Sequence, residues 1–368
     1  MDVVTLEKCL ELKQVGQDAF ESVHTPIWTW PFSTVIPGGT LMALGAAAAY
    51  ETVSSDFSIN TLQAHFLVGP KPDQLLQFRV QCLSESGRFA TRVVTLEQSG
   101  TAVVHITCSF VRTSAMKGRT MTHSVGRSSP QTAEAITLDD LEVGRNKQGP
   151  IFKFQRLPLV YSGNGPAPSN PPPESMTYTS LATISYPIKS KDPRYQALGI
   201  IALSDYHILD APPTLHRIPF GQPAIGDMSR KIPPNEFKLF TSLNHNIRFH
   251  IHEGFRADDL CYVEVNNPWA SKRRAEVQSR IFDRADNLVA TCVQETYYVM
   301  KEKDDRLALH RAYDELANPA ERPVPLHRHA TVIIDSSKTA LKYHEAFQTG
   351  WLAVPTLVLS IVPDEVAA

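Results

Sequence analysis

The feature of this sequence that most restricts its fold is an internal duplication. Residues 88–110 align without a gap on residues 274–296, and Val103 then coincides with Val289. Each copy is predicted to begin with a helix, which is followed by strands that end in a long hairpin. We therefore expect an α+β fold of two similar units, each a curved antiparallel sheet wrapped around a helix. Units paired side by side would bury the sheet edges that each exposes alone.

The first unit is expected over residues 1–112. Its most regular segment follows the break at Pro37-Gly38-Gly39, where Thr40 would cap a helix from about Leu41 to Thr52. That segment is almost entirely Ala, Leu and Met, so we expect it to be buried on most faces. A short amphipathic segment precedes it at residues 6–20. Strands are predicted at 62–67, 75–84, 88–97 and 102–112, with a tight turn at 98–100.

A connector is expected over residues 113–176, because its run GNGPAPSNPPP is too rich in proline and glycine for a helix or a central strand. The second unit, residues 177–300, contains a helix that Asp192-Pro193 would start. Its strands are predicted at 239–249, 260–266, 275–283 and 288–299. Residues 301–368 form a C-terminal extension to which the sequence assigns no role.

Composition excludes several classes of protein. Lys and Arg (36) nearly balance Asp and Glu (38), and the net charge of −2 argues against a nucleic-acid partner. No apolar run reaches the ~18 residues of a membrane-spanning helix, so we expect no membrane insertion. The five cysteines are scattered without metal-ligand spacing, which is typical of reduced thiols.

The familiar catalytic and cofactor motifs are missing. There is no dinucleotide-binding or phosphate-binding glycine loop, no HExxH and no GxSxG. His250 and His252 form an HxH pair of the kind that binds metal ions, but no third ligand stands out near them. Packed or surface histidines are the favoured interpretation. We therefore predict neither a metal nor a cofactor.

Three polar residues stand out in apolar surroundings. Asp205 ends an apolar helix in ALSDYHIL, Ser242 lies in FTSLNHN, and Gln294 lies in ATCVQETYY. A buried carboxylate is costly unless it is hydrogen-bonded or functional. Considered one at a time, Asp205 is more simply explained as a helix cap, and Ser242 and Gln294 as residues that form hydrogen bonds within the sheet. Their joint presence in matching contexts favours a catalytic site.

Several segments, in this order along the chain, resemble the acyl-CoA thioesterase II, or TesB-like, double-hotdog family. IPGGTLMALGAAAA resembles the first hotdog helix of that family, and DPRYQALGIIALSDYHIL resembles the second. SLNHNIRFH is similar to the strand after the second helix, and RIFDRADNLVATCVQETYYV to the closing hairpin. LELKQVGQDAF, HFLVGP and SGRFATRVVTLEQSGTAVVHITCSF resemble the opening segment and the first hairpin. The resemblance spans most of residues 6–300 and implies two tandem hotdog units.

The resemblance also implies a hydrolase that cleaves acyl-CoA or related acyl thioesters. In that family an Asp, a hydroxyl and a Gln hold the hydrolytic water, and they match Asp205, Ser242 and Gln294. Asp205 would act as the general base, and the start of the first helix would offer N–H donors to the oxyanion. The substrate-binding residues implied by the match are Gly38, Gly39, Thr40, His65, Asn244 and His245.

The chain departs from the family pattern around these positions. Asn244 replaces the usual Asp before His245, Thr40 replaces a Gln, and Gln63-Ala64-His65 replaces a motif with His and Tyr. Two alternatives to hydrolysis therefore stay open. One is a hotdog enzyme for dehydration, isomerisation, acyl transfer or cyclisation of an acyl thioester, and the other is an acyl-binding protein without catalysis.

The expected partner is acyl-CoA or a carrier-bound acyl thioester. Two units in one chain already form the pseudo-dimer that such folds need, and further association into homo-oligomers is common for this architecture. Family members occur in the cytosol and in peroxisomes. Because Val366-Ala367-Ala368 is not an SKL-type address, we expect a cytoplasmic location.

Overall fold

The structure is a computed structural model of the whole chain. It describes residues 5–25, 36–128, 138, 142–143, 152–205, 209–221 and 234–302, together with three short strands farther along. The chain divides into two compact units, residues 1–300 and 301–368. The second unit contains the antiparallel strands β15 (Thr331–Val332), β16 (Thr339–Lys342) and β17 (Ile361–Pro363).

The N-terminal half of the first unit consists of a buried helix and an antiparallel set of strands. Helix α2 (Gly38–Tyr50) is buried along nearly its whole length, as its Ala, Leu and Met content predicts. The other elements are α1 (Leu6–Cys9), β1 (Leu12–Gly16), β2 (Ala19–Ser22), β3 (Phe57–Phe66), β4 (Gln77–Glu85), β5 (Phe89–Gln98), β6 (Thr101–Arg112) and the 3-10 turn η1 (Thr113–Met116). The β5–β6 turn is where it was predicted, with positive φ at Ser99 (51°) and Gly100 (78°).

The C-terminal half repeats this plan. Helix α3 (Arg194–Leu203) starts where Asp192 Oδ1 accepts the Arg194 N–H at 2.9 Å, so the predicted Asp192-Pro193 start is observed. The strands and short helices are β7 (Glu142–Val143), β8 (Phe152–Arg156), β9 (Val160–Tyr161), η3 (Pro173–Ser175), β10 (Met176–Ile184), α4 (Ala211–Leu215), β11 (Phe237–Phe249), β12 (Cys261–Ser271), β13 (Arg274–Phe282) and β14 (Leu288–Met300).

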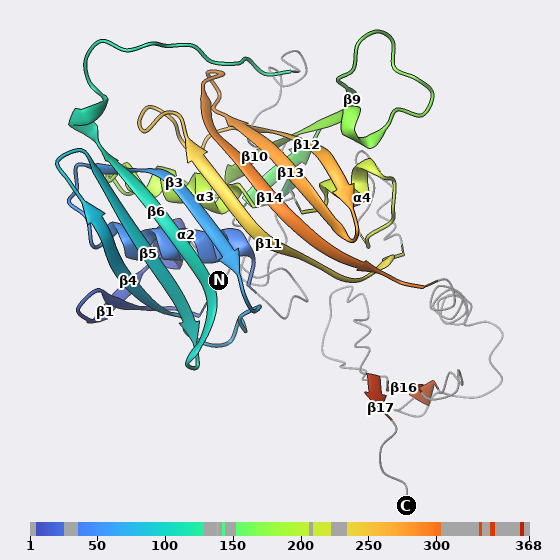
Figure 1. Cartoon of the computed structure of the whole chain (residues 1–368), viewed down its shortest axis with the longest axis horizontal. Helices are drawn as coiled ribbons and strands as arrows, with labels where there is room; N and C mark the ends of the chain where they lie inside the picture. Colours follow the sequence, from blue (N-terminus) through green and yellow to red (C-terminus); the bar gives the residue numbers. More distant parts are fainter. Residues whose placement is uncertain are drawn as a thin grey trace, which may run out of the picture. The chain divides into compact units, whose positions relative to one another are not determined.

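The two halves share one antiparallel sheet, which has 14 strands in the described part of the chain (Figure 1). Read outward from its middle, the order is β3-β6-β5-β4-β2 on one side and β11-β14-β13-β12-β10 on the other. The halves meet where β3 pairs with β11, with Ala64 opposite His245 and Leu62 opposite Ile247. Each half thereby covers an edge that the other would expose. This mirrored arrangement is the predicted double-hotdog α+β fold.

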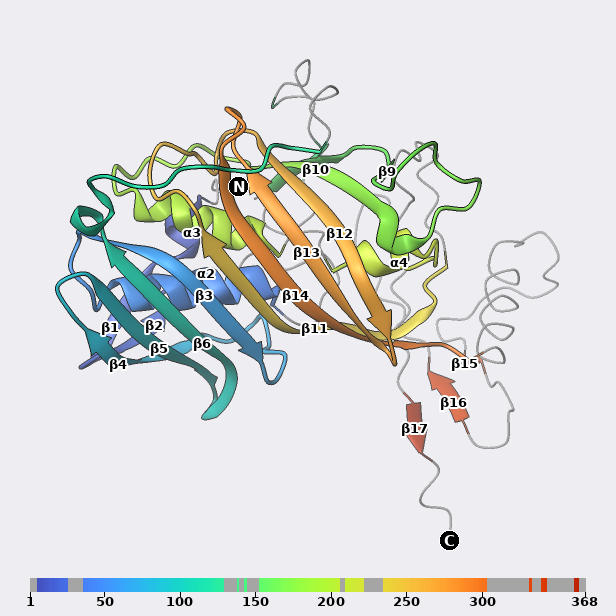
Figure 2. The same ribbon diagram turned by 45° about the horizontal axis from the view of Figure 1, so that its top comes forward.

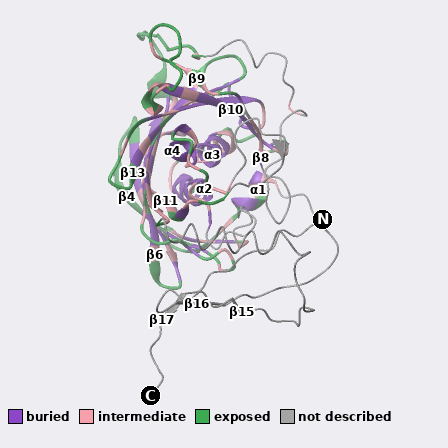
Figure 3. Cartoon of the chain, turned by 90° about the vertical axis from the view of Figure 1, so that its right-hand side faces the viewer, coloured by how far each residue is buried: buried purple, intermediate pink, exposed green. Residues whose placement is uncertain are grey.

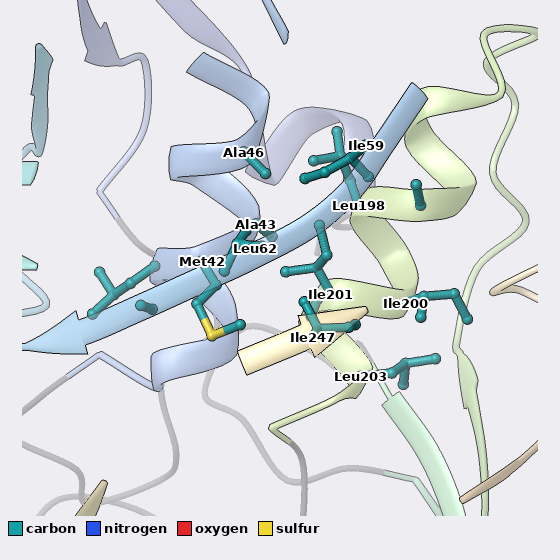
Figure 4. Close-up of a cluster of buried hydrophobic side chains, with 14 of the residues drawn as sticks. Met42, Ala43, Ala46, Ile59, Leu62, Leu198, Ile200, Ile201, Leu203 and Ile247 are labelled. Carbon is teal, nitrogen blue, oxygen red and sulfur yellow. The ribbon is translucent and has the colours of Figure 1, made fainter. Parts of the chain in front are cut away.

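Helices α2 and α3 fill the inner side of the curved sheet (Figures 2 and 3). They run antiparallel, because Gly39 at the start of α2 lies beside Ala202 near the end of α3, while Arg194 reaches back to Tyr50. Figure 4 shows the core between the helices and the central strands, with side chains from α2, β3, α3 and β11. Its labelled members are Met42, Ala43, Ala46, Ile59, Leu62, Leu198, Ile200, Ile201, Leu203 and Ile247.

Three local predictions were wrong. Helix α2 begins at Gly38 rather than Leu41, and Thr40 is buried inside its first turn instead of capping it. The 6–20 segment holds only one helical turn and then a β1–β2 hairpin, whose turn includes Asp18 with φ 51°. Parts of the connector are strands, since β8 and β9 both pair with β10. No helix among the described residues is long and apolar enough to cross a membrane.

Candidate active site

Asp205, Ser242 and Gln294 come together on the inner side of the sheet. The Gln294 side-chain NH2 group donates to Asp205 Oδ1 at 2.7 Å and to Ser242 Oγ at 2.6 Å. Gln294 is fully buried, whereas 11% of the Asp205 side chain is exposed. The buried Gln294 amide therefore holds the Asp205 carboxylate and the Ser242 hydroxyl in place from the core side. The partly exposed Asp205 side chain can still contact a small molecule. Each of the three comes from a different element or its end: α3, β11 and β14.

The carboxylate of Asp205 lies where two helix ends meet. Asp205 follows the last turn of α3, and its Oδ2 accepts the Gly39 N–H from the first turn of α2 at 2.8 Å. The first N–H groups of a helix have no acceptor within the helix, and that end carries partial positive charge, so a carboxylate is stabilised there. This contact also explains why α2 starts early: its acceptor comes from the other half of the chain rather than from a local cap.

Glycine is required at position 39 by this close approach. A Cβ on Gly39 would lie 2.5 Å from the Ala202 carbonyl oxygen and 2.9 Å from Asp205 Cβ. A Cβ on Gly38 would lie 2.7 Å from the ring of Phe66 and 3.1 Å from Asp205 Oδ2. Gly38 and Gly39 therefore let the start of α2 contact the end of α3. Phe66 also lies beside Gly38, which the sequence did not indicate.

An irregularity in β11 gives Ser242 its direction. Ser242 pairs with Thr296 and Asn244 pairs with Glu295, so Leu243 is an extra residue in the ladder. In a regular strand residues three apart point to opposite faces, but one inserted residue restores them to the same face. Ser242 and His245 consequently both point inward, toward Gln294 and Asp205. The bulge thus brings a hydroxyl and an imidazole to the same small region.

His245 lies behind the carboxylate and is completely buried. Its Nδ1 is 3.6 Å from Asp205 Oδ1, and its Nε2 is 3.1 Å from the Oγ of Ser204, a residue that sequence reasoning missed. Burial lowers the pKa of His245, but the Asp205 carboxylate and the Cys292 thiol outweigh this effect and raise that pKa to about 9. Because it is buried, His245 does not face solvent as the predicted substrate-binding residue would.

Asn244 and His65 were predicted to bind substrate, but they lie on the opposite face of the sheet. Asn244 Nδ2 donates to Glu295 Oε2 at 2.9 Å, and Glu295 is also paired with Arg274. His65 is exposed and lies opposite Asn244 in the β3–β11 register, whereas its neighbour Ala64 is buried. Successive strand residues face opposite sides, so the sheet separates both side chains from Asp205, Ser242 and Gln294, and their role in substrate binding stays a prediction.

Neither half of the described chain offers a metal site. No group of three or more His, Cys, Asp or Glu side chains is placed to hold an ion in the described residues. His250 Nε2 instead lies 3.0 Å from Thr291 Oγ1. Burial and the nearby Arg248 lower the pKa of His250. His250 thus has a hydrogen-bond partner at the sheet surface.

Comparison with known proteins agrees with this fold. The family model for the acyl-CoA thioesterase N-terminal domain matches residues 26–111, and the model for the C-terminal domain matches residues 134–298. "Acyl-coenzyme A thioesterase 8" of Mus musculus is 23% identical over 308 residues, which covers 79% of this chain and 88% of the relative. The protein of that name from Homo sapiens is 21% identical over 309 residues, with the same coverage.

Solved structures show the same fold. An acyl-CoA thioesterase II, TesB2, from Mycobacterium marinum has a TM-score of 0.61 at 20% identity, over 81% of this chain and 99% of that one. A tesB protein from Mycobacterium avium subs paratuberculosis has a TM-score of 0.59 at 19% identity, over 80% and 98%. The fold and the family matches thus define a hotdog-type hydrolase. The chain belongs to the acyl-CoA thioesterase family, in its TesB-like double-hotdog form.

Proposed function

We propose that this enzyme hydrolyses acyl-CoA thioesters with a water molecule held between Asp205 and Ser242. The observation that carries the proposal is the Gln294 amide, which bridges Asp205 Oδ1 and Ser242 Oγ at 2.7 and 2.6 Å. Because Ser242 Oγ accepts from Gln294, its own hydrogen is free to be donated to the water oxygen. Asp205 then accepts a hydrogen from the same water molecule. These two hydrogen bonds fix the direction of the remaining lone pair on the water oxygen.

The proposed reaction has two balanced steps. The water oxygen attacks the thioester carbonyl carbon while Asp205 takes one water proton as general base. The tetrahedral oxyanion then collapses, the carbon–sulfur bond breaks, and the CoA thiolate takes the proton back from Asp205. The products are a carboxylic acid and free CoA, and Asp205 returns to its carboxylate form.

The developing oxyanion needs donors, and the first turn of α2 supplies them in this proposal. The Gly39 N–H is already bonded to Asp205, so Gly39 positions the base rather than the oxyanion. We propose that the N–H groups of Gly38 and Thr40 donate to the oxyanion. These residues flank Gly39 in the first turn of α2, where N–H groups have no acceptor within the helix.

The proposal is tested by thiol release from acyl-CoAs of short, medium and long chain. The comparison is the wild type, Asp205→Asn, and Glu295→Gln as a matched control. Glu295 is next to Gln294 on β14 but points to the outer face, where it bonds Asn244 and Arg274. A general base contributes about 10²–10⁴-fold, so Asp205→Asn is expected to lose at least about 10²-fold in kcat while Glu295→Gln stays near wild type.

Two results would count against the proposal. If Asp205→Asn releases thiol as fast as wild type while remaining folded, Asp205 is not the base. If the folded wild type releases no thiol from any acyl-CoA, hydrolysis itself is refuted, and a product that retains the thioester would identify a different hotdog chemistry.

A further inference from the structure

The buried imidazole of His245 is not used by the reaction as proposed. It lies between two polar groups at the end of α3, with Ser204 on one side and Asp205 on the other. It has no exposed surface, so it contacts neither substrate nor bulk water. A buried titratable group directly behind the proposed base needs a physical account.

The hydrogen on Nε2 follows from Ser204. The Ser204 hydroxyl donates its single hydrogen to the Ile201 carbonyl oxygen, 2.8 Å away in the preceding turn. Toward His245, at 3.1 Å, Ser204 Oγ therefore acts only as an acceptor, and Nε2 carries a hydrogen. One of the two imidazole nitrogens is thus fixed as a donor by a contact that does not involve the active site.

The surroundings of Nδ1 call for a second hydrogen. Nδ1 is 3.6 Å from Asp205 Oδ1, and an unprotonated Nδ1 would place its lone pair against a carboxylate in a buried site. A second buried acceptor, Gln294 Oε1, has no donor among the described residues, and Gln294 lies directly opposite His245 in the β11–β14 register. A hydrogen on Nδ1 would direct a donor toward Asp205 Oδ1, and Nδ1 has no other hydrogen-bond partner among the described residues.

We propose that His245 is an imidazolium at neutral pH and a positioning residue, holding Asp205 as a carboxylate aligned with Gln294 and Gly39. The titratable groups that face it are Asp205 from the end of α3 and Cys292 from β14, and its β3 partner is Ala64. The pKa of about 9 agrees with this charge state, since Asp205 and Cys292 together outweigh the effect of burial. The role of His245 in the reaction rests on the proposed function, but its protonation state does not.

The charge state is tested directly by ¹⁵N NMR of the full chain labelled on histidine. In the wild type at pH 7, His245 is expected to show two protonated ring nitrogens. In Asp205→Asn the anion is gone, and the same ring is expected to be neutral at pH 7 with its hydrogen on Nε2. A neutral His245 in the folded wild type at pH 7 would overturn the proposal whether or not the enzyme hydrolyses acyl-CoA.

The positioning role is tested by the pH dependence of kcat/KM in His245→Gln, with His250→Gln as control. His250 follows the same strand but lies on the outer face beside Thr291. A neighbouring positive charge favours the ionised form of a carboxyl group, so loss of the imidazolium should move the acid limb of kcat/KM to higher pH. The control should keep the wild-type acid limb.

A purely structural role gives a different pattern. His245→Gln would then lower kcat/KM by one factor at every pH and leave the acid limb in place, and this result would refute the positioning role. If the variant does not fold, the NMR comparison between wild type and Asp205→Asn still decides the charge state. A wild type that fails to hydrolyse acyl-CoA refutes the proposed function alone, because the NMR experiment reads His245 independently.

Discussion

The contact between the start of α2 and the end of α3 can be tested with one methyl group. In Gly39→Ala the new Cβ would lie 2.5 Å from the Ala202 carbonyl oxygen and 2.9 Å from Asp205 Cβ. Neither atom is the end of a flexible side chain, so the two helices must move apart. An ordinary carbon–oxygen contact needs roughly 0.7 Å more than this, and the shift acts directly on the 2.8 Å bond from Gly39 N–H to Asp205 Oδ2.

The expected loss of stability follows from two opposing terms. Overpacking of this kind costs about 1–3 kcal/mol, and replacing glycine by alanine in a helix returns up to about 1 kcal/mol. A net loss of about 1–2 kcal/mol is expected for Gly39→Ala. Because misplacement of a reacting group by about 1 Å can cost ~10²-fold, kcat should fall more than stability alone explains.

A matched control is available in the same helix. In Gly45→Ala the new Cβ would lie 2.5 Å from Ile106 Cδ1 and 3.2 Å from Leu96 Cδ1, which are ends of flexible side chains. These methyl groups can rotate away, so we expect stability within about 1 kcal/mol of wild type and unchanged kcat. Urea unfolding followed by circular dichroism and steady-state thiol release measure both quantities. Equal stability and equal kcat in the two variants would refute the reasoning.

The remaining predictions concern charge. The pKa of His245 is about 9 in the folded protein against an ordinary 6.5. The stabilisation of the folded state by protonated His245 is therefore complete below pH ~6.5 and is lost as pH rises through ~9. The free energy of unfolding should therefore fall by up to about 3 kcal/mol over this range, and a urea series in which His245→Gln falls equally would contradict the assignment. Arg194 donates to the carbonyl oxygens of Tyr50 and Ser54 at the end of α2, at 3.3 and 2.8 Å. Arg194→Met should lose about 1–3 kcal/mol with kcat unchanged, and a loss of kcat matching that of Asp205→Asn would contradict it.

Sequence patterns predicted the large elements well because those elements depend on local composition and on duplication. The apolar run after Pro37 predicted a buried helix, and strands were predicted for both long hairpins, which the structure contains. The start of α2 was missed because its acceptor is the Asp205 carboxylate, which lies far away in the sequence. Local capping rules consider only nearby residues, so they cannot find such an acceptor.

The direction of the site residues was harder to predict. Asp205, Ser242 and Gln294 were chosen through resemblance to a family, and the structure brings all three together. Asn244 was placed with them through the same resemblance, yet it faces the other side of the sheet. The face of a strand residue depends on register and bulges, and the extra residue at Leu243 leaves no clear mark in the sequence.

Duplication alone would give two equivalent helix junctions, and the structure shows why they differ. At the first, the start of α2 faces a carboxylate from the other half, Asp205, whose side chain is 11% exposed. At the second, the Arg194 N–H at the start of α3 donates to the nearby Asp192 carboxylate. The Arg194 side chain extends to the end of α2 and donates to the carbonyl oxygens of Tyr50 and Ser54. The carbonyl oxygens at the end of α2 thus accept from a guanidinium, whereas at the first junction a carboxylate accepts from a helix start. The shared fold therefore fixes the geometry of both junctions. The residues at the helix ends differ: in the proposed function the first junction supplies the general base, while the second stabilises the pair of helices.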